Sequence, residues 1–125
     1  MYSIVIPAGV AEILSGAFMN CSGLVSVTFA DDGKPEETGA LAFYNCTSLK
    51  EIEIPDGTVT IRDRAFSGCT LLQGVVIPQS VQRIRNYAFE NCSAAVLYCQ
   101  ADVKPSVWYP EWNVSECPVV WGYDG

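Results

Sequence analysis

A five-residue motif recurs along this chain and decides most of what the chain can fold into. The motif is Ala-Phe-x-x-Cys, and its cysteines stand at Cys21, Cys46, Cys69 and Cys92, so successive copies are 25, 23 and 23 residues apart. A period of roughly 20–50 residues is typical of a solenoid, in which each unit buries its apolar face only by stacking on the next unit. Solenoids present surfaces, whereas most enzymes enclose a pocket, so the repeat favours binding over catalysis.

Each copy of the motif belongs to a longer unit with a strand-like stretch. A leucine stands three residues after the cysteine, and two alternating apolar positions then lead to a proline, as in Ile54-Pro55 and Ile77-Pro78. The alternation over residues 49–54 predicts a short strand with one buried face. The proline ends this strand because it has no backbone N–H for the next ladder bond.

The segment after each proline returns along the other side of the stack. In the third unit, the apolar residues of this segment are spaced as in a short helical turn: Ile61, Ala65, Phe66 and Cys69. Stacked units pair their strands in parallel, about 4.8 Å apart. Apolar residues at the same position of successive units therefore lie above one another and form a buried column. The four motif cysteines form one such column. We expect them to be reduced packing residues, since free cysteine behaves as a small hydrophobe and the chain has neither Cys-x-x-Cys nor histidine for a metal site.

The whole unit resembles the leucine-rich repeats of the BspA-like class, found in bacterial and some protozoan surface proteins. The resemblance covers essentially the whole chain and rests on Ile-Pro, Ala-Phe-x-x-Cys and the following leucine at constant offsets. It implies a leucine-rich-repeat solenoid of the α/β class, with a short parallel sheet on one face, turns and short helices on the other, and an aromatic-rich C-terminal cap. It also implies a non-catalytic module for protein–protein interaction or adhesion, without cofactor, at the cell surface or secreted.

We expect a single domain over residues 1–125, with about four repeats in 1–93, the first of them a partial coil, and a capping segment in 94–125. The period fails from about Ala94, and all three tryptophans lie beyond that point, where they are expected to cover the last coil. The second unit departs from the pattern with two extra residues, an acidic loop over 31–37, and Thr38 in place of an isoleucine. Cys99 and Cys117 lie outside the cysteine column, and a disulfide between them stays open.

The chain enters the repeat at once, because residues 4–7 match residues 52–55. No polar cap precedes the first coil, so we expect either the C-terminal piece of a longer protein or self-association through this uncapped N-terminal edge. The first residues lack a basic region and are not expected to act as a signal peptide. The surface location therefore follows from the resemblance, and a cytoplasmic one follows if Met1 is the true start.

Charge and composition exclude several classes of function. A net charge of −7 and a pI near 4.3 argue against nucleic acid and anionic membranes as partners. No apolar run reaches the roughly 18 residues of a membrane span, so no membrane insertion is expected. Without histidine, no Ser-His or Cys-His nucleophile pair can form. A glycosidase would need two carboxylates facing each other across a cleft, which a short solenoid rarely makes.

Two charged groups are weighed as sites. The carboxylates of the 31–37 loop are expected to be solvated, with a weak cation site as the alternative, although their spacing matches no EF-hand. A basic stripe on two coils is expected to be a solvated ion-pair patch rather than an anion site, with Asp63 and Glu90 as counter-charges; it consists of Arg62, Arg64, Arg83 and Arg85.

The candidate protein-binding face consists of outward side chains on and beside the predicted strands: Ser26, Thr28, Lys50, Glu51, Glu53, Gln73 and Val76. A rigid stack holds such side chains in rows, so binding costs little ordering entropy. Two other functions stay open. One is carbohydrate binding by exposed cap aromatics, which needs Trp108, Tyr109 and Trp112 on the surface. The other is a purely structural role as the terminal cap of a longer adhesin.

Overall fold

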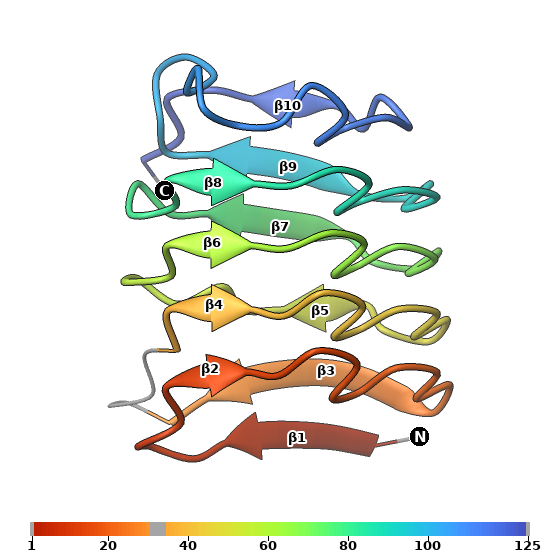
Figure 1. The fold of residues 1–125 in the computed structure, drawn as a ribbon. Helices are drawn as coiled ribbons and strands as arrows, with labels where there is room; N and C mark the ends of the chain where they lie inside the picture. Colours follow the sequence, from red (N-terminus) through yellow and green to blue (C-terminus); the bar gives the residue numbers. More distant parts are fainter. Residues whose placement is uncertain (1, 31–34, 125) are drawn as a thin grey trace.

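The protein is a stack of coils in which two rows of short parallel strands run along the stack (Figure 1). The computed structural model describes residues 2–30 and 35–124. The first row contains β1 (Tyr2–Ile6), β3 (Leu24–Phe29), β5 (Glu51–Ile52), β7 (Gly74–Ile77), β9 (Val96–Cys99) and β10 (Val119–Val120). The second row contains β2 (Glu12–Ile13), β4 (Glu37–Thr38), β6 (Thr60–Ile61) and β8 (Arg83–Ile84). The predicted leucine-rich-repeat solenoid is confirmed.

Paired strands align residues that occupy the same position of the repeat. Ser26 pairs with Glu51 and Val27 with Ile52, which are equivalent positions of two successive units. Side chains alternate in burial along the strands, so that Val75 and Ile77 of β7 are buried while Val76 is exposed. The strand predicted over residues 49–54 is shorter than expected, since β5 covers only Glu51–Ile52 and ends before Ile54-Pro55. In the next coil β7 does run to Ile77 and ends at Pro78, as predicted.

The return side of each coil differs from the prediction of short helices. Within residues 2–30 and 35–124 the structure has no helix, and the return segments form the second row of strands followed by tight turns. The reason lies in the backbone bonding: the N–H of Phe43 donates to the carbonyl of Ala65 in the next coil (2.8 Å), whereas the N–H of Cys46 donates back to the carbonyl of Phe43 (3.2 Å). A helix needs every amide to bond four residues back, and here alternate amides bond to the neighbouring coil.

The core consists of columns of identical or similar side chains. The phenylalanine rings stack nearly parallel, with centroids 5.3 Å apart from Phe18 to Phe43 and 5.4 Å apart from Phe43 to Phe66 and from Phe66 to Phe89. A leucine column runs beside them, fully buried at Leu24, Leu49 and Leu72. In the column of Ile13, Ile61 and Ile84, the second coil contributes the buried Thr38.

The C-terminal segment imitates one more turn of the repeat. The N–H of Tyr87 donates to the carbonyl of Glu111 (2.9 Å), and the N–H of Asn91 donates to Oγ of Ser115 (2.9 Å), so residues 111–117 lie on residues 86–92. Glu116 has a φ of 56° ahead of Cys117, as Asn91 has a φ of 61° ahead of its own cysteine. The cap therefore closes the stack with the same backbone that builds it.

Cys99 and Cys117, between which the sequence left a disulfide open, do not form one. Cys117 extends the cysteine column beyond Cys92, with Sγ 3.4 Å from the carbonyl oxygen of Cys92. Cys99 lies in β9 opposite Ile77, in the isoleucine column. The two residues belong to different columns of the core, and all six cysteines are free.

Candidate interaction surface

The structure places the predicted binding residues on one side of the molecule, along the first row of strands. Ser26 and Thr28 lie in β3, Glu51 in β5 and Val76 in β7. Lys50 and Glu53 directly flank β5, and Gln73 directly precedes β7. Ser26 is half-buried and the other six are exposed. We call this set of seven residues the strand face.

Two carboxylates are the main charges of the strand face. Glu53 is held in place because its Oε1 accepts a hydrogen bond from the backbone N–H of Phe29 (3.0 Å). Glu51 projects from β5 beside Ser26, whose hydroxyl donates to Oγ of Ser3 (2.7 Å). Neither carboxylate forms an ion pair with a cation in the part of the chain that the structure describes.

An aromatic pair continues the strand face toward the cap, and the sequence did not single it out. Tyr98 of β9 pairs in register with Val76, and its ring contacts that of Tyr123 with centroids 4.9 Å apart. The Tyr98 ring leans toward Gly74, where an added Cβ would stand 3.0 Å from Cε2 of the tyrosine. Tyr98 and Tyr123 are 25 residues apart in the sequence, and the segment between them forms the cap. Their contact therefore depends on the stacking of the cap on β9.

The cap tryptophans are core residues, so the carbohydrate hypothesis loses its proposed contacts. Trp108 is 3% exposed and Trp112 is 6% exposed. Their rings contact each other edge-on with centroids 4.9 Å apart, and both pack against Trp121. Tyr109 is half-buried, with the guanidinium of Arg85 over its ring at 5.1 Å. The indole faces close the hydrophobic core and are not available to stack on a sugar.

The arginine stripe lies on the second row of strands, away from the strand face. Arg62 forms an ion pair with Glu37, and Nε of Arg64 lies 3.8 Å from Oε1 of Glu90. Arg64 also lies over the ring of Tyr87 at 4.7 Å. The predicted ion-pair patch is therefore present at Arg62 and Arg64, with Glu37 in place of Asp63 as the partner of Arg62, whereas Arg83 and Arg85 form no ion pair among the described residues.

The cysteine column is a column of hydrogen bonds as well as of packing. Sγ of Cys46 lies 3.1 Å from the carbonyl oxygen of Phe18, and Sγ of Cys92 lies 3.0 Å from that of Phe66. The thiol thus serves as a small donor to the preceding coil, which an alkyl side chain cannot do. Burial raises the pKa of Cys46 to about 11 and the pKa of Cys92 and Cys99 to about 12.

These raised thiol pKa values predict that the protein loses stability in alkali. Above the ordinary thiol pKa of 9.0, the unfolded chain releases protons that the folded chain still binds. The free energy of unfolding should therefore fall as the pH rises from 9 toward 12, and at pH 10 the loss should be about 1.4 kcal/mol for each of the thiols of Cys46, Cys92 and Cys99. Urea unfolding at pH 7 and pH 10 measures this loss.

The variant Cys92→Ala isolates the thiol contribution from that of tyrosine and lysine titration. Its loss between pH 7 and pH 10 should be smaller than that of the unchanged chain by about 1.4 kcal/mol. Equal losses in the two proteins would contradict the assignment.

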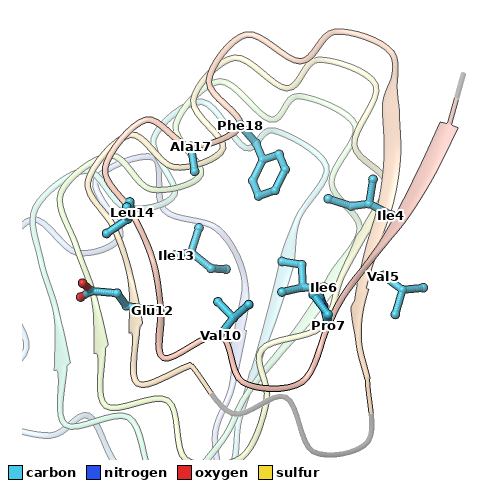
Figure 2. Close-up of a pocket in the computed structure, with 10 residues that line it drawn as sticks. All are labelled: Ile4, Val5, Ile6, Pro7, Val10, Glu12, Ile13, Leu14, Ala17 and Phe18. Atoms are coloured by element: carbon cyan, nitrogen blue, oxygen red, sulfur yellow. The ribbon is translucent and has the colours of Figure 1, made fainter.

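An apolar hollow of about 350 Å³ lies at the first coil, on the end of the stack opposite the cap. Figure 2 shows Ile4, Ile6, Val10, Ile13 and Phe18 directed into it, whereas Val5, Glu12 and Leu14 point away. The inward residues belong to the columns that every later coil continues. The hollow is therefore lined by the same apolar positions that pack against the neighbouring coil elsewhere in the stack.

Metal and membrane sites receive no support from the described residues. Within 2–30 and 35–124, no three histidine, cysteine, aspartate or glutamate side chains come together as metal ligands would. Residues 31–34 of the acidic loop, for which a weak cation site was the alternative, lie outside the described residues. No helix long and apolar enough to cross a membrane occurs in the described part of the chain.

Solved bacterial repeat proteins share this fold. A leucine-rich repeat protein from Eubacterium ventriosum matches 100% of this chain with a TM-score of 0.71 and 22% identity. The leucine-rich repeat protein of T. pallidum, TpLRR, matches 77% of the chain with a TM-score of 0.64 and 28% identity. A leucine-rich cell surface protein from Faecalibacterium prausnitzii matches 98% with a TM-score of 0.54 and 29% identity.

The chain spans 32%, 57% and 35% of the lengths of those three proteins, respectively. No curated protein matches it. The family model for the BspA type leucine rich repeat region matches residues 1–105 in 6 copies. This match covers most of the chain and agrees with the stacked coils, so the chain belongs to the BspA-type leucine-rich repeat family.

Proposed function

We propose that this chain is a non-catalytic protein-interaction module of a bacterial cell-surface protein, with a role in adhesion, and that it binds its partner through the strand face. The observation that carries the proposal is the group of exposed side chains on and beside β3, β5 and β7, three successive strands of the first row, with Ser26 of β3 in register with Glu51 of β5. Bacterial leucine-rich repeat proteins generally serve as interaction and surface modules. One of the solved relatives is itself described as a cell surface protein.

The other surfaces are less suited to binding a protein. On the second row, two arginines are already engaged by Glu37 and Glu90. On the strand face, Glu51 and Glu53 have no such partner in the described chain, so their charges are available without breaking an existing pair. A rigid stack also presents them without loss of backbone freedom on binding.

Two glutamines, one on each row of strands, give a matched test. Gln73 lies beside β7 on the strand face and Gln82 lies beside β8 on the opposite row, and both are exposed. Each is replaced in turn by the photo-reactive residue benzoylphenylalanine, and the protein is irradiated with surface extracts of the source bacterium and of cells it contacts. We expect discrete adducts, identified by mass spectrometry, from position 73 and none from position 82.

Each alternative has its own result in this experiment. Adducts from position 82 alone would place binding on the arginine side and overturn the proposal. No adduct from either position would favour the purely structural role, in which this segment only terminates a longer adhesin.

The N-terminal hollow supports a separate proposal of self-association. Its apolar lining matches the face between coils, so a second copy could cover it. Sedimentation of the chain over a range of concentrations tests this, and Ile4→Asp should abolish any dimer that forms there, since Ile4 points into the hollow.

A further inference from the structure

Two of the four arginines on the second row have no counter-charge. Arg83 in β8 and Arg85 just after it form no ion pair among residues 2–30 and 35–124, whereas the other two arginines of the stripe are each engaged by a glutamate. The chain has 14 acidic and 7 basic residues, so carboxylates are not scarce. The two positive charges are therefore available to a ligand.

The repeat supplies an occupied copy of the same place one coil earlier. The N–H of Arg62 donates to the carbonyl of Thr38 (3.0 Å). The N–H of Arg85 donates in the same way to the carbonyl of Ile61 (2.9 Å), so the two arginines hold equivalent positions. Glu37 stands directly before Thr38, and its carboxylate accepts a hydrogen bond from Nε of Arg62. In this copy, a carboxylate from the preceding coil therefore satisfies the arginine.

At Arg85 the corresponding carboxylate is missing. Thr60 is paired in register with Glu37, so it stands where the next glutamate would be needed, and it has no carboxylate. Nε of Arg85 is accordingly buried without a hydrogen-bond partner in the described chain. A buried donor of a charged group is costly to leave unpaired, and such atoms in native proteins usually meet a water molecule or a ligand. The chain thus leaves an acceptor position at Arg85 unfilled.

The cap holds Arg85 in place. Its guanidinium lies over the ring of Tyr109 at 5.1 Å. The N–H of Tyr109 donates to the carbonyl of Ile84 (2.9 Å), which fixes this ring beside β8. Arg85 is half-buried and Arg83 is exposed. Because residues i and i+2 of a strand point the same way, both side chains lie on the outer face of the second row.

We propose that Arg83 and Arg85 bind the carboxylate group of a small ligand. The carboxylate takes the place at Arg85 that the Glu37 carboxylate takes at Arg62, and Arg83 supplies a second positive charge. A carboxylate suits this place because the parallel N–H donors of a guanidinium match its two oxygens. The site is separate from the proposed function, since it lies on the row opposite the strand face.

Titration of the full chain with sodium acetate, followed by NMR, tests the assignment. We expect a saturable shift of the Nε–H signal of Arg85 and of the backbone amides of Arg83 and Arg85. The Nε–H signal of Arg62 should change little, because Glu37 already engages it. Sodium chloride at the same ionic strength is the control for screening and should give no saturable shift. Absence of a saturable shift with acetate would overturn the inference.

Sodium methanesulfonate separates recognition of a carboxylate from general binding of anions. Methanesulfonate has the charge and the methyl group of acetate, but its three oxygens do not lie in one plane. We expect it to bind more weakly than acetate, and equal or tighter binding would remove the assignment to carboxylates.

The variant Arg85→Lys locates the site. Lysine keeps the positive charge but has no Nε donor and no planar head, so acetate should bind about tenfold more weakly. Lys50→Gln is the control, because it removes a positive charge from the strand face, and the affinity for acetate should stay unchanged. Equal weakening in the two variants would mean that overall charge, rather than a site, attracts the anion.

A carboxylate built into the chain should close the site. Thr60→Glu places one where Glu37 stands relative to Arg62, so we expect the Nε–H signal of Arg85 to move without acetate and its response to acetate to disappear. Thr60→Gln, which has the same length and no charge, should retain most of the acetate binding. Full acetate binding by folded Thr60→Glu would contradict the proposed position, and the Arg85→Lys result decides if Thr60→Glu does not fold.

Discussion

Replacing Phe66 with alanine is expected to lower the free energy of unfolding by about 3–5 kcal/mol. Phe66 is fully buried in the middle of the phenylalanine column, with rings stacked on both sides at 5.4 Å. The substitution removes buried apolar surface and leaves a cavity that two rigid coils cannot close. A domain of this size is stable by only about 5–15 kcal/mol, so the loss is a large share of the total. Guanidinium unfolding measures it.

The matched control is Phe18→Ala at the end of the same column. Phe18 is half-buried and stacks on one ring, that of Phe43, so less burial is lost and solvent can enter the space left behind. We expect a clearly smaller loss of stability than at Phe66. Equal losses would mean that the column does not stabilise the stack through its two-sided contacts.

Replacing Gly39 with alanine is expected to destabilise the protein by about 1–3 kcal/mol, although only one methyl group is added. A Cβ at this position would stand 2.5 Å from the carbonyl oxygen of Ile13 and 2.7 Å from the backbone nitrogen of Ser15. Both obstacles are main-chain atoms of the preceding coil, so no side-chain rotation relieves the clash. The two coils must separate at the pairing of β2 with β4, which guanidinium unfolding will report as a lower midpoint.

Gly23→Ala is the control for this prediction. An added Cβ there meets only the ring of Tyr2, at 3.2 Å, and that ring can turn away. Alanine also restricts the unfolded chain, which stabilises by about 0.4–1 kcal/mol where the backbone accepts it. A change near zero is expected for Gly23→Ala, and a loss as large as that at Gly39 would show that general coil packing, rather than backbone contact, decides both results.

The binding face could be predicted only in part. The outward positions of β3, β5 and β7 follow from alternation, because side chains in a strand point to opposite faces in turn. The position of the Glu53 carboxylate could not be predicted, since it is fixed by a hydrogen bond from the backbone N–H of Phe29 in another coil. Tyr98 and Tyr123 were likewise missed as a pair, because the chain leaves and re-enters the row between them.

The sequence by itself determined the stack. A repeat of nearly constant length places equivalent residues above one another, so the columns of leucine, phenylalanine and cysteine follow from the repeat alone. The sequence also indicates that Cys117 continues the cysteine column as its fifth member. An aromatic residue stands five positions before it, at Trp112, as Tyr87 stands five positions before Cys92.

Only the tertiary structure decided how the return side is built and whether Trp108 and Trp112, which were expected to cover the last coil, also remain exposed. The apolar spacing there fits a helix, but alternate amides bond to the neighbouring coil, and that choice depends on a partner the local sequence does not contain. The residue type alone does not show whether a tryptophan is exposed or buried. Trp108 and Trp112 are buried because they pack on the end of the last coil.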